Sequence, residues 1–278
     1  MGIFDGCLLA SDVDGTLVDS GYINPKNIEK IKFFLNEGGM FSLSSGRSAC
    51  ALSPILRNIE RVSPCVTANG AVIYDFENSR ILAQKVLPKE DYRIAKMVEE
   101  LPKNIAIEIH SGLDVFVTKR TAESDDHERY EEFEVEFTTY EEAAKHTWNK
   151  ILYACDSLED REYLKNFISE KETNCDFFET IAEIYGRTRY YFEQLPKGVS
   201  KISALKNLCE ISGIKEGGLF AIGDYYNDLP MLKEADISAA TAGAPDDIKR
   251  HSDYVTVACE DGAVADFIDY LTEKFENN

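Results

Sequence analysis

The chain has 278 residues, of which 44% are hydrophobic and 29% are charged, and its formal net charge at pH 7 is −20. This length favours two domains, and the apolar fraction is sufficient for packed cores. The acidity argues against nucleic acid and anionic membranes as partners, because both are bound mainly through positive charge. No stretch approaches the roughly 20 apolar residues of a membrane span, and residues 1–6 lack a signal-peptide core, so we expect a soluble, cytoplasmic protein.

Cysteine and histidine contribute no recognisable metal or disulfide pattern. The seven cysteines are scattered along the chain, odd in number and without any C-x-x-C pair. This spacing argues against a disulfide framework and against a zinc site. None of the four histidines has a ligand partner at helical spacing, so no histidine is assigned to a metal.

The first predicted element is a buried strand at residues 7–10, which runs directly into Asp12-Val-Asp14-Gly15-Thr16. Because side chains alternate along a strand, Asp12 and Asp14 would project to the same side. Two carboxylates so close resist joint ionisation unless a cation lies between them. Mg²⁺, which favours carboxylate oxygens, meets that need. An EF-hand calcium site does not fit the segment, because it would require the glycine at the sixth loop position and a helix before the loop. The segment therefore predicts a magnesium-dependent active site.

Further strand and helix signals follow in chain order. Asn24-Pro25 begins a helix that ends at Gly38-Gly39, which matches the preferences for an N-cap, for proline in the first turn and for glycine after the last. A second strand at residues 40–44 runs into Ser45-Gly46-Arg47. Two short strands, at residues 65–67 and 72–74, lie on either side of a turn that contains Asn69.

The character of the chain changes at about residue 84. A helical stripe begins at Pro88, and the later elements alternate between strand and helix patterns, with strands at residues 105–109, 115–118, 150–154, 176–181 and 189–192 and a helix at residues 157–169. We interpret residues 84–191 as a self-contained α+β insert that interrupts a core made of residues 1–83 and 192–278. Residues 121–145 carry ten Asp or Glu, which we interpret as a solvated face.

The last third of the chain returns to the pattern of the first. Ser200 can cap a helix whose first residue is Lys201, near amide groups that attract anions. A third strand at residues 218–222 ends in a loop that carries Asp224 and Asp228. Ligands of open parallel sheets bind outside the carboxyl ends of the strands. We therefore expect these polar segments to converge with Asp12 on one crevice.

Together these segments resemble the haloacid dehalogenase-like (HAD) superfamily of aspartate-nucleophile phosphatases. Asp12-Val-Asp14-Gly15-Thr16 is similar to its first motif, Ser45 to its second, Lys201 to its third and Gly223-Asp224 through Asp228 to its fourth. Asn69-Gly70-Ala71 and Gly198-Val199-Ser200-Lys201 resemble, more narrowly, the Cof-like subgroup with a type IIB cap. The resemblance covers residues 7–270, and the middle third matches only in size and placement.

The resemblance implies an α/β fold, with a doubly wound (Rossmann-like), mostly parallel sheet as the core and the insert as an α+β cap that sets specificity. It implies Mg²⁺ as cofactor, held by Asp12, Asp14, Asp224 and Asp228. Asp14 would contribute its backbone carbonyl, and Asp228 would bind the ion directly or through a water.

Roles for the remaining residues follow from their chemistry. Asp12 is the expected nucleophile, and Asp14 the group that protonates the leaving oxygen and later deprotonates water. Ser45, Lys201 and Asn227 are expected to hold the phosphoryl oxygens. Three weaker candidates for substrate binding are Gly46, Arg47 and Asn69, of which Arg47 and Asn69 either position the substrate or tie loops together.

We therefore expect a phosphatase that acts on small phosphorylated metabolites, sugar phosphates first among them. A phosphomutase or phosphotransferase of the same fold would use the same residues, and an aspartate-phosphorylated signalling module also gathers such groups around Mg²⁺. A binding protein without activity is disfavoured by the complete set of carboxylates. The chain departs from the subgroup pattern at Gly243-Ala244, where Asn-Ala is usual, and at Tyr225-Tyr226, where small or polar residues are usual. The sequence does not indicate an oligomeric state.

Overall fold

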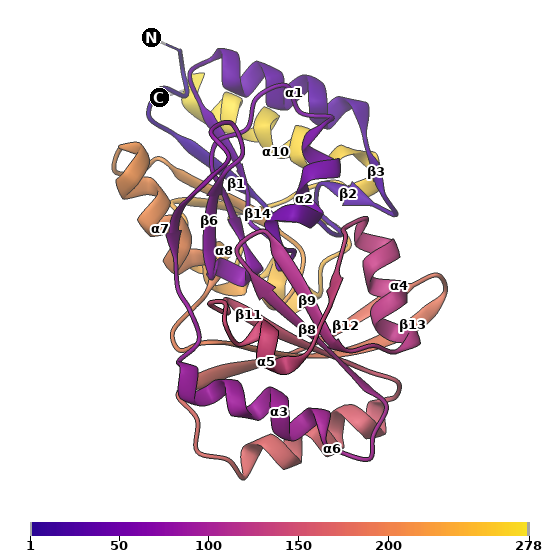
Figure 1. Cartoon of the computed structure of the whole chain (residues 1–278). Coiled ribbons are helices and arrows are strands. Elements are labelled where there is room, and N and C mark those ends of the chain that lie inside the picture. The colour runs from indigo at the N-terminus through magenta and orange to yellow at the C-terminus, as the bar shows by residue number, and fades with distance from the viewer. Residues whose placement is uncertain (1, 277–278) are drawn as a thin grey trace. The chain divides into compact units, whose positions relative to one another are not determined.

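The computed structural model describes residues 2–276 (Figure 1). Contacts between residues divide the chain into two compact units. The first comprises residues up to Gly46, Pro54–Ala83 and Ser200 onward, and the second comprises Arg47–Ser53 and Gln84–Val199. The domain limits expected from the sequence stay a prediction, and residues 1, 277 and 278 of the expected core lie outside the described residues. No helix of residues 2–276 is both long and apolar enough to cross a membrane.

The first unit is built around a five-stranded sheet with the order β16-β15-β14-β1-β4. Every neighbouring pair in it is parallel. Its strands are β1 (Leu8–Ser11), β4 (Met40–Leu43), β14 (Leu219–Gly223), β15 (Ile237–Ala240) and β16 (Tyr254–Val255). The three strands predicted at residues 7–10, 40–44 and 218–222 are thereby confirmed as β1, β4 and β14.

Helices cover both faces of this sheet, which makes the fold the doubly wound α/β type that the sequence predicts. On one face, Leu8 and Ala10 pack with apolar residues of α7 and α8. On the other face, Phe220 contacts Phe275 of α10, which lies beside α1 (Figure 1). The helices are α1 (Pro25–Asn36), α7 (Lys201–Ser212), α8 (Leu229–Glu234), α9 (Asp246–Lys249) and α10 (Cys259–Glu276).

Smaller elements complete the first unit. Asn24 caps α1, since its side chain accepts a hydrogen bond from the amide of Lys26, so the predicted helix start is confirmed. The short strands are β2 (Val18–Asp19), β3 (Tyr22–Ile23), β5 (Cys65–Thr67), β6 (Val72–Asp75) and β7 (Arg80–Gln84), with the 3₁₀ turn η1 (Ala68–Gly70) between β5 and β6. Helix α2 (Ala49–Leu56) crosses the division between the units.

The second unit contains a six-stranded sheet with the order β10-β9-β8-β11-β13-β12. Its strands are β8 (Ile105–Ser111), β9 (Asp114–Lys119), β10 (Glu136–Phe137), β11 (Lys150–Cys155), β12 (Cys175–Ile184) and β13 (Arg187–Pro196). Its helices are α3 (Arg93–Glu99), which follows the 3₁₀ turn η2 (Lys89–Tyr92), α4 (Ala122–Glu131), α5 (Tyr140–Ala143) and α6 (Leu158–Ser169).

One face of this second sheet is apolar and packs on α3 and α6 (Figure 1). Ile107, Ile109, Ile151 and Tyr153 contribute to that packing, together with Trp148, whose ring stacks on another aromatic ring. The acidic stretch that we interpreted as a solvated face contains α4, and the interpretation is wrong for Glu123, which is only 5% exposed, and for Glu131. The side chain of Glu131 is only 13% exposed, because His127, one helical turn earlier, pairs with it.

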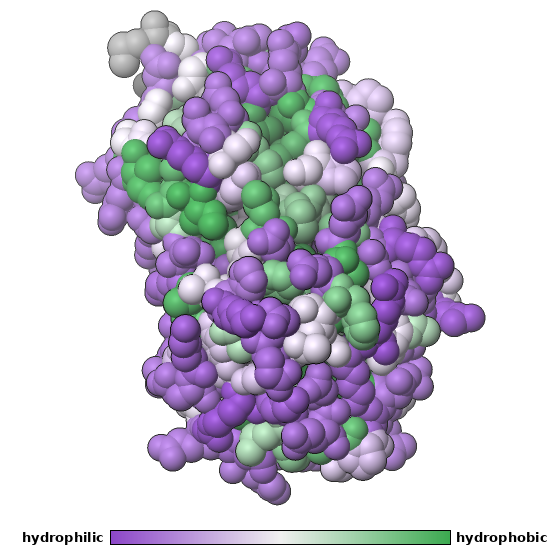
Figure 2. All heavy atoms as spheres, in the orientation of Figure 1, coloured by the Kyte–Doolittle hydropathy of each residue, from purple (hydrophilic) through white to green (hydrophobic). Residues whose placement is uncertain are grey.

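All seven cysteines are free thiols, as their spacing predicts. On the face drawn in Figure 2, most of the visible surface is hydrophilic, with smaller hydrophobic patches between the charged residues. This distribution agrees with a chain in which 29% of the residues are charged.

Candidate active site

Polar segments follow the carboxyl ends of three adjacent strands in the first unit. Asp12 comes directly after β1, Ser45 lies two residues past β4, and Asp224 comes directly after β14. Strand β1 lies between the other two, so the chain adds β4 on one side of it and β14 on the other. Such a switch in winding direction opens a crevice at the carboxyl ends, where ligands of these sheets bind.

Lys201 lies between two carboxylates. Its Nζ atom is 2.6 Å from Oδ1 of Asp12 and 2.6 Å from Oδ1 of Asp228. All three side chains are at least 92% buried. Lys201 is the first residue of α7, and Ser200 fixes that helix start because its hydroxyl accepts a hydrogen bond from the amide of Ser203.

The loop after β14 is organised by Asp228. Its Oδ2 atom accepts hydrogen bonds from the amides of Asp224 and Tyr225, both at 3.1 Å. The hydroxyl of Thr16 donates to Oδ1 of Asp224 at 3.3 Å. Thr16 was not among the predicted site residues. Its hydroxyl group, at the end of the segment that carries Asp12 and Asp14, was the signal from which it could have been predicted. This contact joins segments more than 200 residues apart in sequence.

Three carboxylates form a group suited to a cation. One oxygen from each of Asp12, Asp224 and Asp228 lies within 4.8 Å of the other two. Burial, followed by the charge of Asp228, raises the pKa of Asp12 well above its usual range, although Lys201 opposes this. The same two causes raise the pKa of Asp224 to about 7. Burial lowers the pKa of Lys201, but its two carboxylate neighbours outweigh burial and the net shift is upward.

This donor set fits Mg²⁺. The three groups are all carboxylates, the hard oxygen ligands that Mg²⁺ prefers. Burial and the charge of Asp228 raise the pKa values of Asp12 and Asp224 despite the neighbouring ammonium group of Lys201, so that single cation does not offset the negative charge of the group. Asp12, Asp224 and Asp228 are therefore the residues that would hold the ion.

Gly15 is required by the close approach of Asp224. Its φ angle is +78°, a conformation that L side chains rarely adopt, and an added Cβ atom would lie 2.5 Å from Oδ2 of Asp224. The glycine therefore lets the segment after β1 lie against the carboxylate that follows β14.

Comparison with known proteins decides the family. A model of haloacid dehalogenase-like hydrolases matches residues 9–268. The chain belongs to the haloacid dehalogenase-like hydrolase family. It is a phosphatase of the HAD type, and the predicted resemblance to its Cof-like members is confirmed.

Several relatives match the HAD chain over almost its full length. It is 26% identical to a 5-amino-6-(5-phospho-D-ribitylamino)uracil phosphatase of Bacillus subtilis, with 95% of this chain and 97% of the relative covered. Another phosphatase of Bacillus subtilis is 25% identical, with 95% and 99% covered. Among solved structures, a sugar phosphatase of HAD subclass IIB has the same fold, with a TM-score of 0.78, 18% identity, and 96% and 99% covered.

Two of the predicted HAD site residues are exposed. The side chain of Asp14 is exposed and is not part of the three-carboxylate group, so a role for its backbone carbonyl at the metal stays a prediction. Asn227 is exposed in the loop between Asp224 and Asp228. Both positions leave these side chains accessible from solvent.

Ser45, Gly46 and Asn69 lie together in the first unit. The backbone carbonyl of Ser45 accepts a hydrogen bond from the amide of Asn69 at 3.0 Å, and a Cβ atom on Gly46 would lie 3.1 Å from Oδ1 of Asn69. Asn69 has a φ angle of +55°. The next residue, Gly70, is so close to Ser200 that an added Cβ atom would lie 2.2 Å from its carbonyl oxygen. The turn after β5 thus contacts both the Ser45 segment and the start of the Lys201 helix.

Arg47 belongs to the second unit by its contacts. Its Nε atom is 3.8 Å from Oε1 of Glu131, and its guanidinium lies 5.7 Å from the ring centroid of Tyr130. The sequence left open whether Arg47 binds substrate or ties loops together, and both roles stay predictions.

The two departures from the family pattern lie at exposed or open positions. Tyr225 and Tyr226 are 46% and 51% exposed, and their rings meet edge to face with centroids 5.0 Å apart. A Cβ atom on Gly243 would have only one neighbour within 4 Å, the hydroxyl of Thr241. The tyrosines therefore add aromatic surface to the loop that carries Asp224 and Asp228, whereas Gly243 leaves space.

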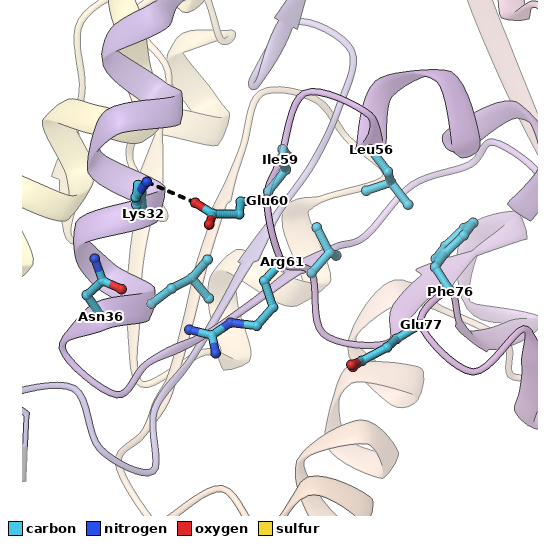
Figure 3. A pocket seen from close by; sticks show the side chains of 10 residues that line it. Lys32, Asn36, Leu56, Ile59, Glu60, Arg61, Phe76 and Glu77 are labelled. Carbon is cyan, nitrogen blue, oxygen red and sulfur yellow. Dashed lines mark ion pairs between the residues drawn. The ribbon is translucent and has the colours of Figure 1, made fainter.

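A cavity of about 620 Å³ lies elsewhere in the first unit (Figure 3). Lys32 of α1 pairs across it with Glu60 at 3.0 Å. Its lining residues, none of which is a predicted site residue, are Lys32, Leu35, Asn36, Leu56, Ile59, Glu60, Arg61, Val62, Phe76 and Glu77. This cavity therefore does not mark the candidate active site. The group of three carboxylates identifies that site instead.

Proposed function

We propose that the protein is a Mg²⁺-dependent phosphatase that hydrolyses small phosphorylated metabolites, sugar phosphates first among them, through an aspartyl-phosphate on Asp12. The observation that carries the proposal is the buried arrangement of Asp12, Lys201 and Asp228, with both carboxylates 2.6 Å from one ammonium group. Phosphoryl transfer demands little beyond positioning and electrostatic stabilisation, and this group supplies both.

In the first step, an oxygen of Asp12 attacks phosphorus and forms a new P–O bond while the ester P–O bond breaks. The leaving oxygen takes a proton from Asp14, whose exposed side chain can exchange protons with water. Lys201 offsets charge on the phosphoryl oxygens, with Ser45 and Asn227 as further hydrogen-bond donors. Bound Mg²⁺ would supply additional positive charge next to the transferring group.

In the second step, water attacks the aspartyl-phosphate and gives up a proton to Asp14. The bond between phosphorus and the Asp12 oxygen breaks, which releases inorganic phosphate and restores both carboxyl groups. Splitting the hydrolysis into two displacements is the advantage that a carboxylate nucleophile offers. Release of free phosphate, rather than of an isomerised sugar phosphate, distinguishes this reaction from that of a phosphomutase.

The recognition of the rest of the substrate is assigned to the insert that we predict at residues 84–191. The ribityl phosphate substrate in the name of the Bacillus subtilis relative and the sugar phosphatase among the structural neighbours support a hydroxyl-rich substrate. All residues proposed for the chemistry lie outside this insert.

The test is the substitution Asp12→Asn, with Asp19→Asn as the matched control. Because an amide cannot act as the nucleophile, Asp12→Asn should lower turnover of p-nitrophenyl phosphate at least roughly a thousandfold. Asp19 is exposed and lies outside the carboxylate group, so Asp19→Asn should retain wild-type turnover. Acid-quenched wild-type enzyme should carry phosphate on the peptide that contains Asp12. Appreciable activity in purified, folded Asp12→Asn protein would show that the mechanism is wrong.

A further inference from the structure

The cavity of Figure 3 and the candidate active site lie at opposite ends of β4. Leu35 and Asn36, two of the lining residues, are the last two residues of α1, which leads into the amino end of β4. Ser45, by contrast, lies past the carboxyl end of β4. All ten lining residues belong to the first unit, and none takes part in the proposed phosphoryl transfer. We call this cavity the α1 cavity.

Two other segments line the α1 cavity at the same end of the sheet. Val62 precedes Ser63, whose amide donates a hydrogen bond to the carbonyl of Phe41 near the start of β4. Phe76 and Glu77 directly follow β6, which pairs antiparallel with β5 and therefore ends beside the start of β5. Three segments that are separate in the sequence thus enclose one space.

The α1 cavity has an apolar side. Leu35, Leu56, Val62 and Phe76 contribute half-buried side chains to it, and Ile59 contributes a side chain that is 8% exposed. Covering apolar surface that water still reaches is favourable. The cavity volume of about 620 Å³ lies within the roughly 300 to 1,000 Å³ that small-molecule sites occupy. The cavity therefore has both the room and the apolar surface for a ligand with apolar groups.

The charged residues of the α1 cavity leave one group of each sign without a partner. Lys32 pairs with Glu60 at 3.0 Å, so these two charges offset one another. Within residues 2–276, the side chains of Arg61 and Glu77 form no ion pair or hydrogen bond, either with each other or with another residue. Figure 3 shows their charged ends apart from one another. The cavity thus offers one guanidinium group and one carboxylate to a ligand.

A zwitterion matches these two charges. An anion would meet Arg61, but it would also meet the carboxylates of Glu60 and Glu77. In addition, the chain has a net charge of −20, which repels anions. A cation would meet Glu77, but it would also meet Arg61 and Lys32. A molecule with one carboxylate and one ammonium group can pair with both unpartnered groups, and it carries no net charge.

The separation of the two unpartnered charges favours a dipeptide over a single amino acid. Arg61 and Glu77 lie on different segments and do not pair with each other. A single amino acid holds its ammonium and carboxylate groups on one carbon atom, and its one side chain would cover only part of the apolar side. A dipeptide places a peptide unit between the two charged groups and brings a second side chain.

We propose that the α1 cavity binds a dipeptide with apolar side chains and free termini. The carboxylate of the dipeptide pairs with Arg61, and its ammonium group pairs with Glu77. Its side chains cover the apolar side of the cavity. Because this site is separate from the residues assigned to phosphoryl transfer, the proposal does not depend on the proposed function.

The first test is a titration of ¹⁵N-labelled wild-type protein with L-leucyl-L-leucine, followed through the backbone amide resonances. The resonances of residues 56–62 and 76–77 should shift, with a Kd of about 1 mM or tighter. N-acetyl-L-leucyl-L-leucine lacks the ammonium group and L-leucyl-L-leucinamide lacks the carboxylate, so each should bind about three- to tenfold more weakly. Glycylglycine keeps both charges but has no side chains, and it should bind at least about tenfold more weakly.

The second test assigns each charge of the dipeptide to its partner. Arg61→Gln should weaken binding of L-leucyl-L-leucine about three- to tenfold, but it should leave binding of L-leucyl-L-leucinamide unchanged, because that ligand has no carboxylate for Arg61 to meet. Glu77→Gln should likewise weaken binding of the free dipeptide and leave binding of the N-acetyl form unchanged. Both side chains are exposed, so the variants should fold. The matched control is Arg57→Gln, at an exposed position outside the cavity, which should bind the free dipeptide as the wild type does.

Two results would overturn the proposal. If L-leucyl-L-leucine leaves the resonances of residues 56–62 and 76–77 in place, the α1 cavity holds water only. If the blocked dipeptides bind as tightly as the free dipeptide, or if Arg61→Gln and Glu77→Gln bind the free dipeptide as the wild type does, charge pairing does not define the ligand. Neither result bears on the phosphatase, because all three variants should keep wild-type turnover of p-nitrophenyl phosphate.

Discussion

His127 should make the stability of the protein depend on pH in a way that no other histidine does. Its Nδ1 atom lies 2.7 Å from Glu108 and its Nε2 atom 3.3 Å from Glu131. Burial disfavours the charged ring, but the two carboxylates outweigh burial and raise the pKa of His127 to about 10. The ordinary pKa of histidine is about 6.5, so the folded protein keeps a proton that the unfolded chain loses.

The sign and size of the effect follow from this difference. The stabilisation is fully present below pH about 6.5 and is lost as the pH rises toward 10, at about 1.4 kcal/mol per pH unit. Between pH 7 and pH 8.5 the contribution of His127 to the free energy of unfolding should therefore fall by about 2 kcal/mol. The cysteine thiols add a slope of the same sign within this range, because burial raises their pKa values in the folded protein while the ordinary pKa of a thiol is about 8.5. The contribution of His127 is therefore the part of the slope that a His127 variant removes.

Urea unfolding between pH 7 and pH 8.5 measures this slope. His127→Gln should be less stable at pH 7 by about 3 to 5 kcal/mol, because it leaves two buried carboxylates without their partner. It should also lose the part of the slope that His127 contributes, since glutamine does not titrate, and should keep the part that comes from the cysteine thiols. His251→Gln, at an exposed position, should keep the wild-type slope. A wild-type protein with no slope, an equal slope in His127→Gln, or a His127 ring that titrates near pH 6.5 by NMR would refute the reasoning.

Two further predictions concern the metal and the Lys201 helix. EDTA should abolish phosphatase activity, and Mg²⁺ should restore it. Ca²⁺ should compete without supporting turnover, because its larger coordination number lets it take both oxygens of Asp12. Full activity with Ca²⁺ alone, or in excess chelator, would contradict this. Gly70→Ala should lower the unfolding free energy by at least about 3 kcal/mol and reduce kcat, since the new Cβ atom would lie 2.2 Å from the Ser200 carbonyl oxygen. The control is Gly217→Ala, because Gly217 also has a positive φ angle but an added Cβ atom there would have no neighbour within 4 Å. This control should lower the unfolding free energy by about 1 kcal/mol. Equal losses of unfolding free energy for the two variants, in a thermal or urea unfolding assay, would rule out the steric cause.

The catalytic group was predictable because its local signals are strong. Asp12 and Asp224 each follow an apolar run that ends in a glycine-containing loop, and Lys201 follows a serine cap. Parallel strands place such loops at one edge of a sheet, so the convergence of these residues needed no knowledge of long-range contacts. The 2.6 Å contacts of Lys201 bear out the expected proximity, while the catalytic roles stay proposals.

The buried ion pairs of the second unit were not predictable in the same way. Residues 105–109 were interpreted as a strand from their apolar positions, and the polar residue among them carried no sign of its partners. Glu108 meets His127 19 residues later, and Lys150 meets Glu193 43 residues later, through pairings that depend on strand register. The sequence also gave no signal for burial of Glu131, because its cationic partners come from a helix turn and from the distant Arg47.

The position of β1 inside the parallel sheet has a consequence for biosynthesis. Leu8 pairs with Met40 on one side and with Leu219 on the other, so one edge of β1 finds its partner only when most of the chain has been made. At about 5 to 20 residues per second, a ribosome needs roughly 10 to 40 seconds to cover that separation. During this interval the edge presents unpaired amides and carbonyls flanked by apolar side chains, a template for association with other chains. Expression at high translation density should therefore make this protein depend on chaperones that cover nascent strands.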